Sequence, residues 1–224
     1  MDINADFTIR AVVHAANVPW IASPIQGVDR RMLDRMGAEV ARATTIVRYA
    51  PGSAFTSHVH TGGEEYLVLS GTFQDEHGDF PKGSYVRNPP QSFHTPSAAD
   101  GAVIMVKLWQ FDINDRIAVT LRPDDMISQP ASKGVVIIPL HSDDRETVRI
   151  EEWAKGTQVS ILDHGGAEVF VIDGGFAEGG EDFRADSWLR LPVGEKLIAT
   201  AGIKGARVWI KTGHLRISPT PPAI

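Results

Sequence analysis

Short runs of hydrophobic residues recur along the whole chain, and Gly, Pro, Asp and Ser separate one run from the next. Runs of this kind, rich in Val, Ile, Leu and aromatic residues, are typical of β-strands bounded by turns. Their even spacing predicts a sandwich or a barrel. The clearest runs are TTIVRY (44–49), EYLVLSG (65–71), AVIMVKLWQF (102–111), GVVIIPL (134–140), EVFVIDG (168–174) and RVWIKTG (207–213). We therefore predict an all-β protein.

One segment, VDRRMLDRMGAEV (28–40), fits two patterns. Val28, Met32 and Met36 recur at every fourth position, as on one face of a helix, whereas Val28, Arg30 and Met32 alternate as in a strand. Gly37 suits the turn of a hairpin, and for that reason we favour the strand.

The two halves of the chain repeat one another. TGGEEYLVLSGTF (61–73) aligns with HGGAEVFVIDGGF (164–176) at an offset of 103 residues. The same offset matches Phe80 with Phe183, Ser84 with Ser187, Tyr85 with Trp188, Arg87 with Arg190 and Pro89 with Pro192. A repeat of this length predicts a duplicated β unit. We place the boundary between residues 121 and 122, which gives two units, 1–121 and 122–224.

Candidate metal ligands gather in the first unit. His58 and His60 are two residues apart, so a strand projects both imidazoles from one face. The turn TGG (61–63) precedes Glu64 and lets the chain bring a carboxylate back to the same place. His94 arrives from a separate, later strand. Three imidazoles and one carboxylate suit a borderline divalent metal.

The spacing of these residues resembles the sequence motifs of the cupin family. Residues 52–71 read Gly52-x5-His58-x-His60-x3-Glu64-x6-Gly71, which matches the first motif throughout. The second motif is matched at Gly83, Pro89 and His94, while Gln91 and Ala98 stand where the family has glycine and asparagine. The resemblance implies two tandem cupin barrels, each a double-stranded β-helix or jelly roll.

Residues 20–112 are similar to one branch in particular, the C-terminal cupin domain of ChrR-type anti-sigma factors. RATTIVRYAPGSAF (42–55) and the stretch from HTGGEEYLVLSG to QSFHTP (60–96) carry this resemblance. In that family the matching residues hold zinc. The resemblance therefore implies one divalent metal at His58, His60, Glu64 and His94. Zinc is the first expectation, with iron, manganese and nickel as alternatives.

The inhibitory module of ChrR-type factors is helical and uses cysteines. This chain has no cysteine, and its β pattern is already under way at residue 20. We therefore expect no inhibition of a sigma factor. The resemblance is therefore to the sensing domain of ChrR-type factors alone. In that family this domain is linked to the response to singlet oxygen and related oxidants.

The second unit serves as an internal comparison for the metal site. The offset of 103 carries the four proposed ligands onto Ile161, Asp163, Ala167 and Leu197, three of which are apolar. We predict a second cupin barrel without a metal. Asp163 and the neighbouring His164 do not form a remnant site in this interpretation, because neighbouring side chains alternate across a strand. For the same reason Glu65 is expected to face away from Glu64 and to serve the scaffold or an interface.

Other residues have simpler expected roles. Tyr66 and Val68 share the strand face of Glu64 and are expected to line the cavity. The facing of Arg48 and Arg87 is undetermined, and each is expected to form a surface ion pair. Trp109 and Phe111 are expected to pack in the core. His77 is expected in a solvated hairpin, and His14, His141 and His214 at the surface or the edge of the core.

Composition narrows the partners. The chain has 224 residues, 42% of them hydrophobic, and a formal net charge of −6, so nucleic acid and anionic membranes are not expected. No signal peptide or apolar run long enough to span a bilayer is read from the sequence, which makes the cytoplasm the expected location. A small-molecule ligand is an expected partner. A homodimer is a further expectation, because barrel edges need covering.

Two kinds of function fit the four ligands, and a third possibility is a non-catalytic scaffold in which the metal only ties strands together. A ChrR-like metal-binding cupin would sense oxidants or small molecules, with a closed four-coordinate zinc. A metal-dependent enzyme, such as a small-molecule dioxygenase, would keep two coordination positions open for its substrates. Whether the protein is an enzyme stays open on the sequence alone, and the first interpretation is favoured slightly.

Overall fold

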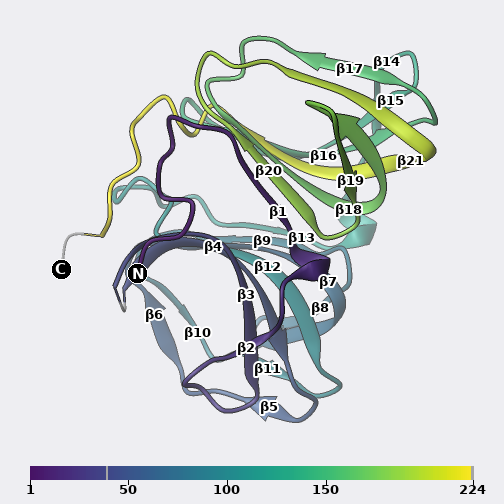
Figure 1. Cartoon of the computed structure of the whole chain (residues 1–224). Helices are drawn as coiled ribbons and strands as arrows, with labels where there is room; N and C mark the ends of the chain where they lie inside the picture. Colours follow the sequence, from purple (N-terminus) through teal and green to yellow (C-terminus); the bar gives the residue numbers. More distant parts are fainter. Residues whose placement is uncertain (39, 223–224) are drawn as a thin grey trace. The chain divides into compact units, whose positions relative to one another are not determined.

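The computed structural model describes residues 1–38 and 40–222, and the chain forms two compact β units (Figure 1). The first unit contains residues 1–5, 19–125 and 220–222, and the second contains 6–18 and 126–219. Two short 3-10 helices, η1 (Ala15–Asn17) and η2 (Pro123–Asp125), are the helical elements among the described residues. The all-β prediction is confirmed.

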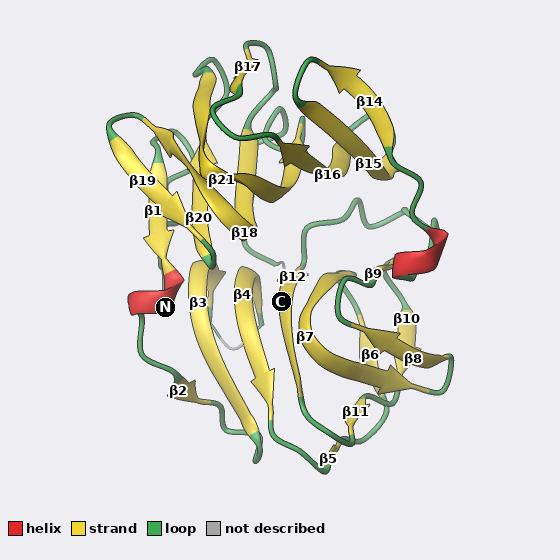
Figure 2. Cartoon of the chain, turned by 90° about the vertical axis from the view of Figure 1, so that its right-hand side faces the viewer, coloured by secondary structure: helices red, strands yellow, loops and turns green. Residues whose placement is uncertain are grey.

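The first unit is built on one sheet that folds back into a second layer (Figure 2). Its strand order is β13 (Val119–Leu121), β9 (Tyr85–Asn88), β7 (Glu64–Asp75), β12 (Ala102–Leu108), β4 (Ala41–Tyr49), β3 (Val28–Gly37) and β2 (Ile21–Ala22). Shorter strands branch from this path or pair separately: β5 (Ser53–Ala54), β6 (His58–His60), β8 (Gly78–Pro81), β10 (Ser92–His94) and β11 (Ser97–Ala98).

Strand β7 links the two layers. Its first half pairs with β9 and β12, and its second half pairs with β8, with a bulge opposite Val103 and Ile104. A bulge bends the strand and increases its twist, which lets one strand serve both layers. The core between the layers is a hydrophobic cluster that includes Tyr66, Val68 and Phe73.

Residues 28–37 form a strand, as favoured above. β3 pairs with β4 in antiparallel register, with Arg30 opposite Val47 and Gly37 opposite Ala41. Cross-strand partners share a face, so Arg30, Val47 and Val28 all point to the interior side. The helical spacing of Val28, Met32 and Met36 has no structural counterpart, because a bulge after Met32 resets the alternation.

The second unit repeats the strand order of the first. Its path is β1 (Ala11–His14), β20 (Ser187–Leu191), β18 (Ala167–Glu178), β21 (Leu197–Thr212), β16 (Thr147–Trp153), β15 (Val135–Ser142) and β14 (Gln129–Ser132). β17 (Gln158–Ile161) pairs with β21, and β19 (Glu181–Arg184) pairs with β18. Each central strand of this path has its counterpart at the same place in the first unit, which is the structural form of the sequence repeat.

The compact units differ from a simple division at residue 121. Residues 6–18, which the sequence analysis assigned to the first unit, belong to the second, because β1 pairs along the edge of β20. The equivalent edge, that of β9, is paired by β13 from the segment that follows the first repeat. An unpaired strand edge exposes backbone hydrogen-bonding groups, so each unit gains from covering it. The hydrophobic pattern of a short strand does not say which edge it covers.

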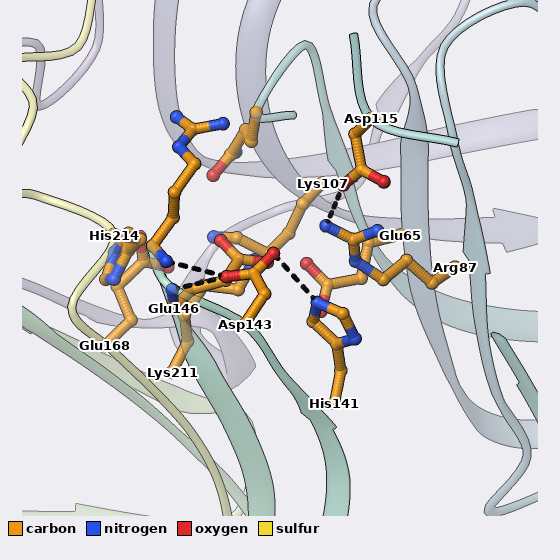
Figure 3. A network of polar contacts seen from close by, with 12 residues as sticks. Glu65, Arg87, Lys107, Asp115, His141, Asp143, Glu146, Glu168, Lys211 and His214 are labelled. Atoms are coloured by element: carbon orange, nitrogen blue, oxygen red, sulfur yellow. Dashed lines mark hydrogen bonds and ion pairs between the residues drawn. The ribbon is translucent and has the colours of Figure 1, made fainter. Parts of the chain in front are cut away.

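Buried polar groups also recur at equivalent places. The Tyr85 hydroxyl donates to Glu65 at 2.6 Å in the first unit, and Trp188 Nε1 donates to Glu168 at 3.2 Å in the second. Figure 3 shows one further buried ion pair in each unit, Arg87 with Asp115 at 2.6 Å and Lys211 with Glu146 at 3.0 Å, at positions that are not equivalent. Glu65 therefore serves the scaffold, as expected, with its carboxylate on the face opposite to Glu64.

Candidate metal centre

The three proposed histidine ligands come from one pair of short strands. β6 and β10 are antiparallel, and His58 lies directly opposite His94 in their register. His60 is two residues from His58 and therefore shares the face. Val59 and Phe93, which alternate with the histidines, point the other way and are exposed. Two strands thus place all three imidazoles on one side.

The turn before Glu64 depends on its glycines. A Cβ on Gly62 would lie 2.0 Å from the Trp109 ring, and one on Gly63 would lie 2.5 Å from the Phe111 ring. Gly63 also has a φ of +78°, which L side chains rarely adopt. The two aromatic rings pack directly on the turn because no side chain intervenes. They hold the start of β7 in place, so Glu64 begins that strand beside the histidines.

The four residues converge closely. One ligand nitrogen from each of His58, His60 and His94 lies within 4.8 Å of the other two. The ring centroids are 4.7–5.0 Å apart and the ring planes are inclined by 71–75°. Glu64 Oε2 lies 3.4 Å from His60 Nε2 and 3.7 Å from His94 Nε2. His60, Glu64 and His94 are buried, and His58 is exposed.

The hydrogen bonds of the imidazoles leave their Nε2 atoms available. His58 Nδ1 lies 3.3 Å from the Thr56 carbonyl, to which only a protonated Nδ1 can donate. His94 Nδ1 lies 3.2 Å from Asp75 Oδ2. Burial lowers the pKa of His60, which favours its neutral form. Burial opposes the charge on His94, but Asp75 and the charge of Glu64 raise its pKa above the usual value. Protons therefore compete with a metal at His94.

The chemistry of this donor set fits a divalent cation. His60 Nε2 is buried and has no hydrogen-bond partner among the described residues. Buried polar atoms are nearly always satisfied, so an orphaned imidazole nitrogen beside a buried carboxylate indicates a missing partner of positive charge. Three nitrogens and one oxygen suit zinc, iron, manganese or nickel. A six-coordinate metal would keep two positions beyond these four.

A cavity of about 980 Å³ opens onto the four-residue cluster. His58, His60 and Glu64 are part of its wall, while His94 lies outside its lining. The remaining wall is largely apolar, and it includes Val28, Val47, Tyr49, Phe55, Val106, Leu108 and Trp109. Sites for small organic molecules have volumes of roughly 300–1,000 Å³ and such mostly apolar walls.

Two supporting residues were not anticipated from the sequence. Asn88 Nδ2 donates to Glu64 Oε2 at 3.2 Å, from the position on β9 that pairs with Glu64. Asp75, at the far end of β7, accepts from His94. Groups of this kind fix the orientation of metal ligands. The strand pairing of 64–67 with 85–88 would have indicated Asn88, but Asp75 lies in a polar stretch that carries no motif.

Replacing Asp75 by asparagine is expected to weaken metal binding by about 10- to 100-fold, because His94 loses the carboxylate that holds its Nδ1 proton. Competition with a chelator of known affinity measures this change. Asp79→Asn is the matched control: Asp79 lies in the same hairpin, its carboxylate accepts from Gln74, and its replacement should leave the affinity unchanged. Equal metal affinities of the Asp75 variant and the parent protein would show that Asp75 does not support metal binding.

The other residues considered in the sequence lie as follows. Tyr66 and Val68 face inward but are part of the packed core and do not line the cavity, which corrects that expectation. Burial raises the pKa of Tyr66, so its hydroxyl stays neutral. Trp109 lines the cavity instead of packing wholly in the core.

The two arginines left undetermined point away from the cavity. Arg87 is buried, pairs with Asp115 and stacks on Phe111 at 4.2 Å, so it is not a surface residue. Arg48 forms an exposed ion pair with Asp29, as expected.

The remaining histidines each have a local partner or are exposed. His77 is exposed in the hairpin between β7 and β8. His14 lies 3.0 Å from the Ser187 hydroxyl, His141 Nε2 lies 3.2 Å from Asp143, and His214 Nε2 lies 2.9 Å from Glu168. None of these four lies with the cluster of His58, His60 and His94.

Three of the four equivalent positions of the second unit belong to or pack against a hydrophobic core, and the fourth, Asp163, is exposed. Ile161 lies opposite Leu197 in the register of β17 and β21, just as His58 lies opposite His94. Leu197 and Ala167 are buried in the core cluster, and Ile161 packs against it. His164 is not on a strand, which corrects the expected alternation with Asp163. It is buried, and burial lowers its pKa.

Substituting Asp163 or His164 by alanine is therefore expected to leave the metal content of the purified protein unchanged, because neither residue faces a second ligand set in the described part of the chain. Elemental analysis of both variants beside the parent protein checks this. A fall in metal content in either variant would show that the second unit takes part in binding.

Comparisons with known proteins agree with this architecture. The family model of the ChrR Cupin-like domain matches the chain twice, over residues 8–112 and 116–216. No curated protein matches the sequence. Among the described residues, no helix is long and apolar enough to cross a membrane.

Several solved structures share the fold. A candidate dioxygenase from Nostoc punctiforme is 14% identical, with a TM-score of 0.69, over 100% of this chain and 86% of that one. A protein from Pseudomonas aeruginosa described as glyoxylate-induced is 13% identical, with a TM-score of 0.72, over 98% and 94%. The oxalate decarboxylase of Lactobacillus farciminis, solved with formate, is 10% identical, with a TM-score of 0.65, over 91% and 86%.

At such identities these similarities show the fold alone, and that fold is the duplicated cupin. The two family matches together cover most of the chain and coincide with the two repeats. The chain belongs to the ChrR Cupin-like domain family and carries two copies of that domain.

Proposed function

We propose that the first unit binds one divalent metal at His58, His60, Glu64 and His94 and uses it to act on a small organic molecule, as a metal-dependent enzyme of the dioxygenase type. The observation that carries this proposal is the cavity of about 980 Å³ whose wall includes three of the four ligands. When bound, the metal supplies a Lewis acid and a template that orients a chelating ligand. The residues around it supply the shape and the charge of the site.

The cavity distinguishes this function from a closed structural zinc site. A structural zinc is coordinated by four protein ligands and has no position left for another molecule. Here His58 is exposed to the cavity, and apolar side chains such as Phe55 and Leu108 face the same space. The Nostoc punctiforme protein, described as a candidate dioxygenase, has the same duplicated fold and supports the reaction class.

Ligand sensing is the second candidate, and the family itself favours it, since the chain matches the ChrR Cupin-like domain. A sensor would bind a small molecule at the same metal without turning it over. Zinc would fit that role, whereas iron, manganese or nickel would fit the enzyme. The identity of the native metal therefore separates the two functions.

Oxygen consumption tests the proposed enzyme. The protein is loaded in turn with iron, manganese, nickel and zinc, and small chelating substrates such as diketones, catechols and hydroxy acids are screened with an oxygen electrode. We expect oxygen uptake with at least one redox-active metal and none with zinc. Tight binding of chelators without oxygen uptake under any metal would favour the sensor and contradict the enzyme.

A further inference from the structure

The metal-facing cavity contains one charged side chain that the metal site does not use. Among the described residues that line it, Glu64 and Arg30 are the only charged ones apart from the histidines, and Glu64 is a proposed ligand. Arg30 lies on β3, opposite Val47 and on the interior face of the sheet. It is partly buried, so its guanidinium is neither fully hydrated nor enclosed.

Arg30 has no protein partner for its charge. Its Nε is buried without a hydrogen-bond partner, and no ion pair or ring contact of its guanidinium is formed within the described chain. Arg31 Nε also lacks a hydrogen-bond partner, but the Arg31 guanidinium stacks on Trp20 at 4.3 Å. Arg48 pairs with Asp29 and stacks on the same ring at 4.5 Å. Those two side chains belong to the outer face. A buried guanidinium nitrogen left unsatisfied is costly, and its presence in a cavity wall indicates a ligand group that satisfies it.

The charge of the cavity supports an anionic ligand. The negative charge of Glu64 and the positive charge of Arg30 offset each other, so the charge of a bound divalent metal would remain uncompensated. A cleft of positive charge with apolar walls concentrates anions. Guanidinium is also the side chain whose planar donors match a carboxylate in two parallel hydrogen bonds.

The apolar lining limits what else the ligand contains. Val28 and Val47 flank Arg30 on β3 and β4, and Tyr49, Phe55 and Trp109 add aromatic surface to the cavity wall. Burial raises the pKa of Tyr49, so its hydroxyl contributes no negative charge. The walls therefore suit an apolar or aromatic body of a small molecule. A purely polar diacid would leave most of this surface without a contact.

We infer that the ligand of this cavity is a small organic acid with an apolar or aromatic body, whose carboxylate binds Arg30 while a second, chelating group faces the metal centre. This assignment rests on the proposed function and names its substrate class. Arg30 is a substrate-binding residue in this account. It holds the far end of the ligand and so fixes which atoms are presented to the metal.

A homologous series of catechol acids tests the assignment. Zinc-loaded full-length protein is titrated calorimetrically without oxygen. The acids are 3,4-dihydroxybenzoate, 3,4-dihydroxyphenylacetate and 3-(3,4-dihydroxyphenyl)propionate, and 4-methylcatechol is the neutral reference. All four share the chelating group, and the acids place the carboxylate at increasing distance. We expect at least one acid to bind at least about tenfold tighter than 4-methylcatechol, the usual worth of a hydrogen bond to a charged group.

Variants assign the preference to Arg30. Arg30→Met should bind the acids and 4-methylcatechol equally while retaining its zinc, and Arg30→Lys should recover part of the preference. Arg48→Ala, on the outer face of the neighbouring strand, should keep the full preference. Equal binding of acids and neutral reference by the parent protein, or a preference that survives in Arg30→Met, would overturn the assignment and leave the metal site intact. Failure of 4-methylcatechol to bind the zinc-loaded protein would instead contradict the proposed function on which it rests.

Discussion

Replacing His60 by alanine is expected to abolish stoichiometric metal binding, with affinity reduced by more than about 100-fold, which exceeds the usual effect of losing an outer hydrogen-bond partner of a ligand. His60 Nε2 is a buried candidate ligand atom without a hydrogen-bond partner among the described residues, and it lies 3.4 Å from the Glu64 carboxylate. Elemental analysis of the purified variant, followed by titration with metal against a chelator, measures the loss.

Two further variants make this result specific. Glu64→Gln keeps the shape of the side chain and its contact with Asn88, yet removes the negative charge, so it should also lose affinity while remaining folded. His14→Ala, in the second unit, removes a histidine that contacts Ser187 and should retain full metal. A His60→Ala protein that still holds one metal per chain would show that the ligands lie elsewhere.

The second large effect is expected on stability. Glu168 is fully buried, and its carboxylate accepts from Trp188 Nε1 at 3.2 Å and lies 2.9 Å from His214 Nε2. Replacing Glu168 by alanine leaves both donors buried without this acceptor and opens a cavity. Breaking a buried charged interaction from one side typically costs about 3–5 kcal/mol. We expect the free energy of unfolding of the second unit to fall by this amount, measured by urea denaturation with tryptophan fluorescence.

Matched substitutions separate burial from charge. Glu195→Ala removes an exposed carboxylate of the same unit and should change stability by no more than about 0.5 kcal/mol. Glu168→Gln retains an acceptor for Trp188, so its free energy of unfolding should lie between those of Glu168→Ala and Glu195→Ala. If Glu168→Ala were as stable as Glu195→Ala, the buried polar groups repeated in the two units would not stabilise the fold.

Much of the first unit could be predicted because its chemistry is local. His58 and His60 are two residues apart on one strand and therefore share a face. Glu64 follows a turn that contains Gly62 and Gly63. The internal repeat identified Ile161 and Leu197 as the positions equivalent to His58 and His94. The two pairs have the same strand register in the structure. Alternation and an internal repeat are properties of neighbouring residues, so a single sequence contains them.

What could not be predicted depends on distant pairing. Nothing in the pattern AVVH (11–14) says that this strand joins the edge of β20, more than 170 positions later. Asp75 reaches His94 only because β7 bends into the second layer. Arg30 looked like one arginine among several, and only the register of β3 with β4 turns it toward the cavity. Tyr66 and Val68 face inward as alternation requires, but packing covers them.

We expect a single metal at the cavity wall, with coordination positions open to a ligand. X-ray absorption at the metal edge, with elemental analysis, on protein purified without a metal-affinity tag measures this. It should find one divalent metal per chain, three imidazole nitrogens and carboxylate oxygen as its protein ligands, and five or six ligands in total with exchangeable water. A closed four-coordinate zinc without water, or a protein that holds no metal at neutral pH, would contradict this expectation.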